Sequence, residues 1–236
     1  MRLVYPILHL VLADSELEQV PREIADRRVI RRLAQRRGRR PTELILNSSL
    51  HFPAMNKLSD GDRRGRPDIV HMCLLSALDT PLNREGILRI YVHARHDKLI
   101  TVDPSVSLPK MSYRFEGLME HLFLKGQAPP ENPLMRIEDA SLESLLKRLK
   151  PKKVMTFSDR GRRKPWKRIY NGLLKEDDIC VVIGGFPHGD FLSDVDKLSD
   201  ELICIDPELL HASTVVSRAI YAYEEMFGIP ELRLRR

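Results

Sequence analysis

The stretch Val181-Val182-Ile183-Gly184-Gly185-Phe186-Pro187-His188-Gly189 decides the fold of this chain. Apolar, β-prone residues lead directly into three glycines, which predicts a buried strand ending in a loop whose backbone comes close to something. A second apolar run, Leu202-Ile203-Cys204-Ile205, breaks at Asp206-Pro207, and a helical pattern follows from Ala212. Two neighbouring strand ends followed by a helix predict a small-molecule pocket at the edge of a sheet.

The rest of the chain alternates between strand and helix patterns. Further strands are predicted at 3–12, 43–47, 87–94, 98–102 and 154–157, and helices at 21–34, 67–78, 112–125, 141–149 and 212–227. A polar loop is expected at 56–65, and a basic loop with room for a helix at 160–175. The three prolines in 127–133 make that stretch the candidate linker. This alternation favours an α/β fold with a mostly parallel sheet.

Composition narrows the class of protein. The chain has 236 residues, enough for one large domain or a domain with an extension. No apolar stretch approaches the roughly 20 residues of a membrane span. The apolar start contains Pro6 and His9 and lacks a cleavage pattern, so a strand is favoured over a signal peptide. Three cysteines without C-x-x-C spacing indicate neither a disulfide framework nor a zinc site, and we expect buried thiols in a reducing cytoplasm.

The basic residues are clustered rather than spread. The formal net charge is +6, and eight arginines fall between Arg27 and Arg40. Two further clusters lie at 63–66 and at 160–168, the latter around Trp166. Arginine in such density suits phosphate, because its planar fork binds oxygens bidentately. Each cluster alone is also compatible with a solvated surface, but the three together favour a nucleic-acid partner.

Several kinds of chemistry find no support in the motifs. The glycine loop is neither the dinucleotide fingerprint G-x-G-x-x-G nor a P-loop, and no G-x-S-x-G motif marks a serine nucleophile. His93 and His96 lie three apart on or beside a strand, where they would not share a face, so no metal site is predicted.

The segment Arg63-Arg64-Gly65-Arg66-Pro67-Asp68-Ile69-Val70-His71 supports two interpretations. In the first, Asp68 in the first turn of a helix complements the helix dipole, which is worth about 0.3–1 kcal/mol. In the second, Arg66 holds a phosphate while Asp68 accepts a proton or hydrogen bond from a base. The residues alone leave both open.

Six segments resemble, in order and spacing, one known family. They are Leu46-Asn47-Ser48-Ser49-Leu50-His51, Arg64-Gly65-Arg66-Pro67-Asp68-Ile69-Val70-His71, Pro81-Leu82-Asn83, Tyr91-Val92-His93, Arg114-Phe115-Glu116-Gly117-Leu118-Met119 and Gly184-Gly185-Phe186-Pro187-His188-Gly189. The family is that of the nucleolar-essential ribosome-biogenesis pseudouridine N1-methyltransferases, of the SPOUT class. The resemblance covers essentially the whole chain.

The resemblance implies a single SPOUT-like domain over residues 1–236, with helices on both faces of the sheet and a family-specific extension. It also implies a C-terminal trefoil knot within the cofactor-binding region, about 153–228. The expected methyl donor is S-adenosylmethionine (SAM), and the expected substrate is N1 of a pseudouridine in small-subunit ribosomal RNA. A homodimer is expected, with ribosomal proteins as further partners during assembly, in the cytoplasm or, in a eukaryotic host, the nucleolus.

The resemblance also assigns site residues. Its cofactor positions fall on Thr156, Gly184, Gly189, Ile205, Asp206, Pro207, Glu208, Leu209 and Leu210. Its RNA-contact positions fall on Arg66, Asp68, Ser107, Lys110 and Arg114. The family pattern carries three basic residues over 107–114, and Ser107 departs from it. Asp68, together with Arg66, is the expected catalytic residue, which orients the base and assists removal of its N1 proton.

Two other functions remain open at this stage. The first is a non-catalytic RNA-binding factor in ribosome assembly, and the second is a knotted methyltransferase that acts on tRNA. The terminal helix leaves a structural alternative open as well. Its apolar residues, Val215, Val216, Ala219, Ile220 and Tyr223, suit both a dimer interface and an intramolecular core.

Overall fold

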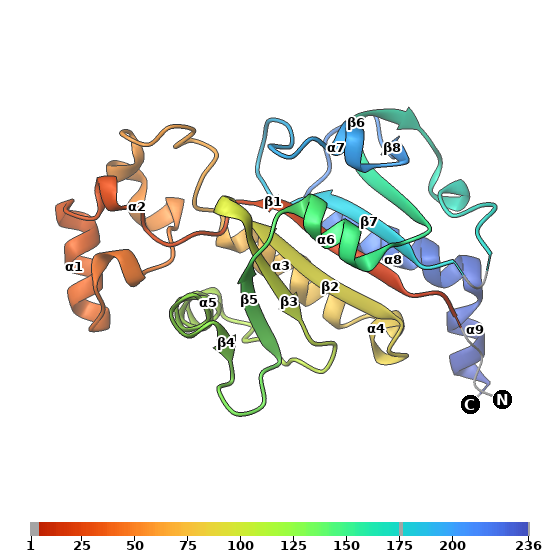
Figure 1. Ribbon diagram of the computed structural model, residues 1–236, viewed down its shortest axis with the longest axis horizontal. Helices are drawn as coiled ribbons and strands as arrows, with labels where there is room; N and C mark the ends of the chain where they lie inside the picture. The colour runs from red at the N-terminus through yellow and green to blue at the C-terminus, as the bar shows by residue number, and fades with distance from the viewer. Residues whose placement is uncertain (1–4, 175–176, 236) are drawn as a thin grey trace.

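The computed structural model describes residues 5–174 and 177–235 and contains one eight-stranded sheet (Figure 1). Its strand order is β4-β5-β3-β2-β1-β7-β6-β8. The strands are β1 (Leu8–Ser15), β2 (Leu88–Ala94), β3 (Lys98–Val102), β4 (Gln127–Ala128), β5 (Met135–Asp139), β6 (Lys153–Arg163), β7 (Ile179–Gly184) and β8 (Glu201–Cys204). Strands β2, β1, β7, β6 and β8 run parallel, whereas β3, β5 and β4 join antiparallel. The predicted α/β class with a mostly parallel sheet is confirmed.

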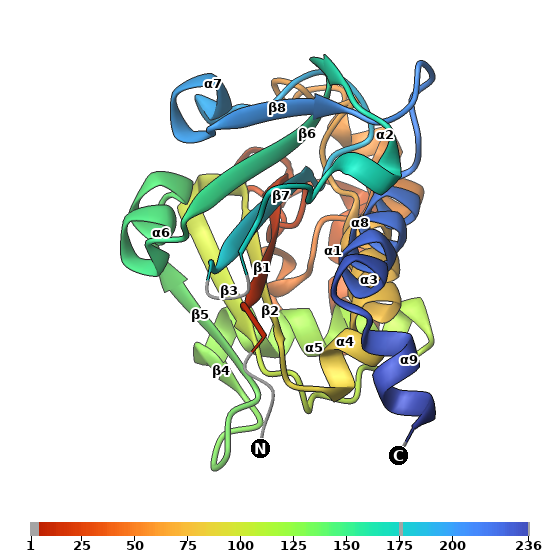
Figure 2. The same ribbon diagram turned by 90° about the vertical axis from the view of Figure 1, so that its right-hand side faces the viewer.

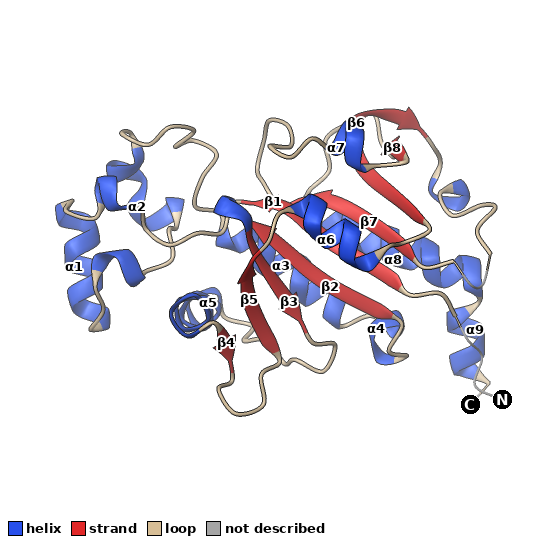
Figure 3. Ribbon diagram, viewed as in Figure 1, coloured by secondary structure: helices blue, strands red, loops and turns tan. Residues whose placement is uncertain are grey.

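Helices cover both faces of this sheet (Figures 2 and 3). The α-helices are α1 (Arg28–Arg37), α2 (Ser48–Met55), α3 (Pro67–Leu78), α4 (Pro81–Arg84), α5 (Ser112–Lys125), α6 (Leu142–Leu149), α7 (Val195–Leu198), α8 (Ala212–Phe227) and α9 (Ile229–Leu234). Helices α3, α5 and α8 pack with Leu10 and Leu12 of β1, while α6 and α7 pack with Val11 and Ala13 on the other side. Successive strand residues point to opposite faces, so the nearly continuous apolar run of β1 serves two cores.

The apolar residues of α8 belong to the first of these cores. All five that the sequence analysis singled out are buried within the chain. Tyr223 also donates its hydroxyl hydrogen to the carbonyl of Pro6 at 2.5 Å. The helix ends at Phe227 because Gly228 adopts a left-handed conformation, φ 64°, that favours glycine. These five residues therefore form an intramolecular core, and of the two alternatives only that one holds for them.

An extension between β1 and α3 carries a third, smaller core and projects from one end of the sheet (Figure 1). The predicted helix at 21–34 is displaced, because a 3-10 turn at Arg22–Ile24 precedes α1. The predicted strand at 43–47 is wrong: Pro41–Glu43 forms a 3-10 turn, and only Ile45 makes an isolated bridge, with Gln19. Helix α2 was not predicted from the sequence.

Two further differences concern the second half of the chain. Strand β6 continues through Arg163, so the first part of the expected basic loop at 160–175 is strand; Lys175 lies outside the described residues. The stretch 127–133, taken as a linker, begins with β4, which pairs with β5 in the same sheet. Residues 3 and 4 of the first predicted strand also lie outside the described residues. Within 5–174 and 177–235, no helix is both long and apolar enough to cross a membrane.

Candidate functional site

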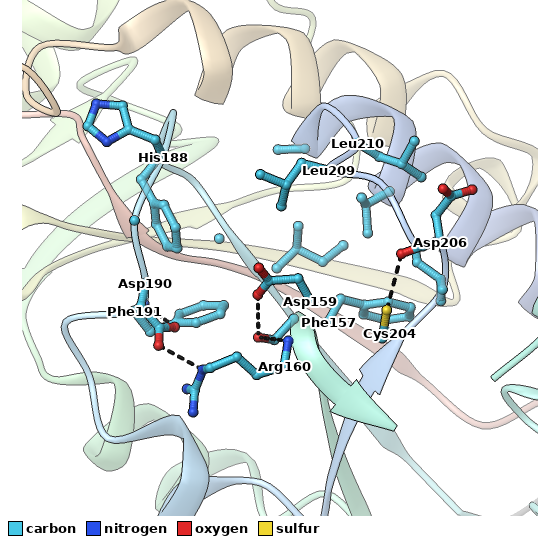
Figure 4. Close-up of a pocket in the computed structure, with 18 of the residues that line it drawn as sticks. Phe157, Asp159, Arg160, His188, Asp190, Phe191, Cys204, Asp206, Leu209 and Leu210 are labelled. Atoms are coloured by element: carbon cyan, nitrogen blue, oxygen red, sulfur yellow. Dashed lines mark hydrogen bonds and ion pairs between the residues drawn. The ribbon is translucent and has the colours of Figure 1, made fainter. Parts of the chain in front are cut away.

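A cavity of about 520 Å³ opens where β7 and β8 end beside β6, at the point where β6 stops pairing with β7 (Figure 4). Its walls are the loop that follows β7, the loop that follows β8 and the start of α8. Apolar side chains from these elements form much of its lining, namely Phe157, Ile183, Phe186, Phe191, Ile203, Leu209, Leu210 and Val215. Four carboxylates, from Asp159, Asp190, Asp206 and Glu208, also line it. The volume and the mixed lining are typical of a site for a small organic molecule.

Seven of the nine cofactor positions expected from the sequence line this cavity: Gly184, Gly189, Ile205, Asp206, Glu208, Leu209 and Leu210. Pro207 and Thr156 do not. Thr156 is fully buried, and its hydroxyl lies 2.5 Å from that of Ser199 in a hydrogen bond. The next residue, Phe157, lines the cavity instead, because successive residues of a strand face opposite sides.

The loop that follows β7, residues 185–193, is called the glycine loop here. Its first residue is hydrogen-bonded to β1. The backbone N–H of Gly185 donates to Ala13 and its carbonyl accepts from Glu16, at 2.8 and 3.1 Å. A Cβ on Gly185 would lie only 2.1 Å from the Ser15 hydroxyl oxygen. The close backbone approach that the sequence predicted is therefore, at this glycine, an approach to the chain's own first strand.

Asp14 holds the far end of the same loop. Its carboxylate accepts hydrogen bonds from the backbone N–H groups of Leu192 and Ser193 and from the Ser193 hydroxyl, at 2.7, 2.9 and 2.8 Å. Burial alone would raise the pKa of Asp14, but hydrogen bonds from His93 and Ser193 outweigh it and lower that pKa. Asp14 is therefore a carboxylate that accepts hydrogen bonds from three donors of the loop.

Arg63 braces the middle of the loop from outside the cavity. Its Nε donates to Glu16 Oε1 at 2.6 Å, and its Nη1 donates to the carbonyl of Asp190 at 2.5 Å. The guanidinium also lies 4.1 Å from the centroid of the Phe186 ring. Only 7% of Arg63 is exposed, and Glu16, which also pairs with Arg95 at 2.9 Å, is fully buried. The sequence analysis took Arg63 as part of a phosphate-binding cluster; the structure gives it an internal role.

Arg66 and Asp68 project together, three residues further along. Arg66 donates from Nε and Nη2 to the two carboxylate oxygens of Asp68, at 2.9 and 2.7 Å. This pairing raises the pKa of Arg66 above its ordinary value. The backbone N–H of Arg66 donates to the carbonyl of Glu16 at 2.8 Å, so the pair adjoins the β1 end that anchors the glycine loop. The Asp68 side chain remains half exposed and open to a ligand.

The other three expected RNA contacts lie on the neighbouring loop and helix. Ser107, Lys110 and Arg114 are all exposed. One turn beyond Asp68 on α3, His71 lies 2.7 Å from the carbonyl of Pro109 through its Nε2, and its ring stacks on Phe115 with centroids 4.3 Å apart. The start of α3 is thereby packed against the segment 107–115. The structure brings the five positions together at the start of α3, on the loop before α5 and on the first turn of α5.

The sequence analysis missed several cavity residues. Arg160 is one, and it bridges Asp190 of the glycine loop and Asp196 at 2.7 and 3.1 Å. Asp159 and Phe191 are others (Figure 4). They could have been found from the rule that parallel strands bring their carboxyl ends to one edge, since β6 stops pairing with β7 at Phe157, next to the end of β7. Among the described residues, no three His, Cys, Asp or Glu side chains gather closely enough to hold a metal ion.

Comparison with known proteins agrees with this geometry. The model of the EMG1/NEP1 methyltransferase family matches residues 10–224. The chain is 44% identical to the ribosomal RNA small subunit methyltransferase Nep1 of Thermococcus kodakarensis, over 94% of this chain and 100% of that one. It is 45% identical to Nep1 of Pyrococcus furiosus, over 92% and 96%. The crystal structure of Archaeoglobus fulgidus Nep1 bound to S-adenosylhomocysteine is similar, with a TM-score of 0.81 and 32% identity, over 95% of this chain and 99% of that one.

Proposed function

Because this chain belongs to the EMG1/NEP1 methyltransferase family, we propose that it transfers a methyl group from SAM to N1 of a pseudouridine in small-subunit ribosomal RNA. The observation that carries the proposal is the cavity at the ends of β7 and β8, beside β6. Its lining holds seven of the expected cofactor positions, and a relative of the same fold was solved with S-adenosylhomocysteine, the demethylated form of that donor.

The residues of the cavity fit this cofactor by their chemistry. Phe157, Ile183 and Leu210 offer apolar surface for an adenine ring, and Gly184 and Gly189 lie beside it in the same lining. The carboxylates of the lining suit ribose hydroxyls and a positive charge, because oxygen acceptors stabilise both. When bound, the cofactor supplies a methyl group on a positively charged sulfur. Thr156 and Pro207 would then shape the two strand ends from behind the lining.

Asp68 and Arg66 would act on the base. N1 must lose a proton as it gains the methyl group, and the half-exposed carboxylate of Asp68 would orient the ring and accept that proton. Arg66 holds both oxygens of Asp68, which fixes the direction of the carboxylate. Holding the reacting atoms in line is worth about 7–11 kcal/mol at its upper range, so we assign most of the catalysis to positioning.

Lys110, Arg114 and Arg66 would bind the RNA backbone around the target. Their positive charges attract phosphate from two adjacent elements, whereas Ser107 contributes no charge. A base modified inside an RNA loop must be unstacked to reach a pocket. The exposed position of these side chains beside Asp68 supports an RNA loop entering there.

Two finer features of the family belong to the same proposal. For the trefoil knot at 153–228, the support is the close packing of β6 on β8, its parallel neighbour, where a Cβ on Gly161 would lie 2.5 Å from the backbone of β8. For the homodimer, the support is the exposure of Tyr221 and Met226 on α8, whose other apolar residues are buried or partly buried. Light scattering of the purified protein would detect a dimer directly.

Single-turnover methylation of an rRNA fragment tests the proposal. We expect Asp68→Asn to slow the reaction strongly while SAM binding, measured by calorimetry, stays unchanged, because Asp68 lies outside the cavity lining. Unchanged turnover would remove Asp68 from the mechanism.

Mass spectrometry of rRNA and tRNA from cells lacking the protein separates the alternatives. Loss of one methylated pseudouridine from small-subunit rRNA supports the proposal, and loss from tRNA alone contradicts it. Wild-type protein that binds RNA but shows no SAM binding would favour the non-catalytic assembly factor.

A further inference from the structure

One face of α1 carries a row of arginines that the site described above does not use. Arg28, Arg31, Arg32, Arg36 and Arg39 are all exposed. Spacings of three and four residues place them along one side of the helix and just past its end. Within residues 5–174 and 177–235, none of the five guanidinium groups lies within ion-pairing distance of a carboxylate. We call these five residues the α1 arginine row.

The α1 arginine row works against the stability of its own helix. Like charges three and four residues apart repel each other. The first turn of α1 contains no acidic residue, and Arg28 and Arg31 lie near the helix N-terminus, where the helix dipole disfavours cations. A surface selected only for solubility would intersperse acidic residues. A bound anion would relieve this repulsion between the positive charges.

The opposite side of α1 holds the row rigidly in place. Ile30 and Ala34 are buried in the small core of the extension. Arg37 reaches from α1 to α5, where its Nη2 and Nη1 donate to Glu116 and Glu120 at 3.1 and 2.5 Å. Both of these glutamates are buried. Arg37 thus uses its charge internally, and it fixes the position of the row relative to the rest of the molecule.

This anchor connects the α1 arginine row to the expected RNA surface. Arg114 lies on α5 only two residues before Glu116, the acceptor of Arg37. Asn47, at the start of α2, donates to the same Glu116 at 2.6 Å. Figure 1 shows α1 at the outer end of the extension, beyond the start of α3. The α1 arginine row and Arg114 therefore lie on two helices, α1 and α5, that Arg37 joins directly.

We propose that the α1 arginine row binds the phosphate backbone of the ribosomal RNA that flanks the target nucleotide. The proposal rests on the proposed function for the identity of the RNA. Arginine suits phosphate by its planar fork, and several such contacts give affinity without reading sequence. No exposed apolar side chain stands within 27–40 in the described chain, so the row lacks the apolar face that a membrane surface requires. The row extends the RNA footprint and takes no part in methyl transfer.

The test compares two triple variants that each lose three positive charges. The first is Arg28→Gln, Arg32→Gln and Arg36→Gln. The control is Lys147→Gln, Arg148→Gln and Lys152→Gln, at and beside α6 on the other face of the sheet (Figure 2). Both use glutamine, which keeps helix propensity close to that of arginine and lysine. The probe RNAs are a minimal hairpin with the target loop and the same hairpin with an extended stem.

For the extended RNA, we expect the α1 variant to reduce the slope of log affinity against log salt by about 2 to 3, since each phosphate contact contributes about 0.7–0.9. The minimal hairpin should show a smaller change, and turnover at saturating RNA should match the wild type. The free variant should melt no lower than the wild type, because repulsion is removed. An unchanged slope on the extended RNA, or an equal loss in the α6 control, would overturn the proposal.

The outcomes keep this proposal separate from the proposed function. If the wild-type protein bound RNA through the α1 arginine row but methylated nothing, the proposed function would be wrong and the proposed RNA contact would stand. If methylation were normal and the salt slope of the α1 variant were unchanged, only the proposed RNA contact of the α1 arginine row would be overturned. If the row bound an acidic protein instead of RNA, the salt slope of RNA binding would stay unchanged in the α1 variant, and the proposal would be overturned.

Discussion

At the scale of single residues, Arg63 and Arg64 make a natural pair of experiments. Each guanidinium is buried and bound to a carboxylate, Arg63 to Glu16 and Arg64 to Glu18, with N–O distances of 2.6 to 2.8 Å. Removing one partner from such a pair costs about 3–5 kcal/mol, because the other charge stays buried. Only Arg63 also touches the glycine loop, through Asp190 and Phe186.

We therefore expect Arg63→Ala and Arg64→Ala to lower the melting temperature similarly, while Arg63→Ala alone weakens SAM binding. A tenfold loss, about 1.4 kcal/mol, is the scale we expect for the loss of one loop anchor. Calorimetry below the melting temperature of both variants measures it. Equal SAM affinity in the two variants would show that the loop keeps its shape without Arg63.

His93 gives a prediction for the dependence of stability on pH. Its ring nitrogens lie 3.3 Å from Asp14 and 3.0 Å from Asp97. Burial would lower the pKa of His93, but these two carboxylates outweigh it and raise the pKa above 6.5. The folded protein then holds a proton that the unfolded chain releases more readily. The stabilisation is complete below pH 6.5 and is lost as the pH rises through the raised pKa.

Unfolding in guanidinium chloride between pH 6 and pH 9 checks this, with His93→Gln as the comparison. The wild type should lose stability over that range by more than the variant, because the variant has no proton to lose at this position. Parallel curves would mean that the charge on His93 does not stabilise the fold.

These residue networks lay beyond sequence reasoning for a physical reason. Arg63 is 47 residues from Glu16 and 127 from Asp190, and no periodicity connects such partners. By contrast, Gly184 and the loop after β8 were predictable, because a strand ending in glycines or at Asp206-Pro207 identifies itself locally. Thr156 shows the limit of that approach, since a shift of one residue along a strand moves a side chain to the opposite face.

At the scale of elements, the close approach of β6 to β8 affects the cavity wall formed by the loop after β8. A Cβ on Gly161 would lie 2.5 Å from the backbone N of Ile203 and from the backbone C of Leu202. Backbone atoms cannot move aside as a flexible side chain can. Strand β8 leads directly into the 205–210 loop, so a displacement of β8 would reach the cofactor positions.

We expect Gly161→Ala to destabilise the protein by about 1–3 kcal/mol, the usual cost of overpacking, and to weaken SAM binding as well. The matched control is Gly117→Ala in α5, where a Cβ meets nothing within 4 Å. Alanine there should stabilise the helix by about 0.5–1 kcal/mol. Denaturant unfolding of both variants measures these changes, and an unchanged free energy of unfolding for Gly161→Ala would contradict the close approach of β6 to β8.

The elements that sequence patterns misplaced have identifiable causes. Residues 43–47 look like a strand, but Pro41 starts a 3-10 turn that Arg40 and Glu43 close with a hydrogen bond of 2.6 Å between their side chains. Asn47 then caps α2 through the backbone N–H of Ser49. Helix α2 contains Pro53, which removes one backbone donor and argues against a helix in the sequence, yet the helix continues through it to Met55.

At the scale of the whole molecule, the extension has a core of its own, and polar contacts together with Ile45, which packs into a core of the sheet, join it to the sheet. The core of the extension contains Ile24, Ile30 and Leu44 and is separate from the two cores of the sheet. Hydrogen bonds and ion pairs join them, such as those from Arg37 and Asn47 to Glu116. Parts with separate cores open with separate free energies, so we expect the extension to open locally without the sheet.

Hydrogen exchange with and without SAM tests this expectation. A ligand slows only those openings that destroy its site, and at 100 times its Kd it adds about 2.7 kcal/mol to them. Amides of β6, β7 and the glycine loop should therefore exchange more slowly with SAM, whereas those of α1 should not change. Added RNA should slow α1 as well, because the α1 arginine row would then be occupied. If SAM slowed α1 and β7 by the same factor, the extension and the sheet would open as one unit. The α1 arginine row would then be held in place by the stability of the whole chain.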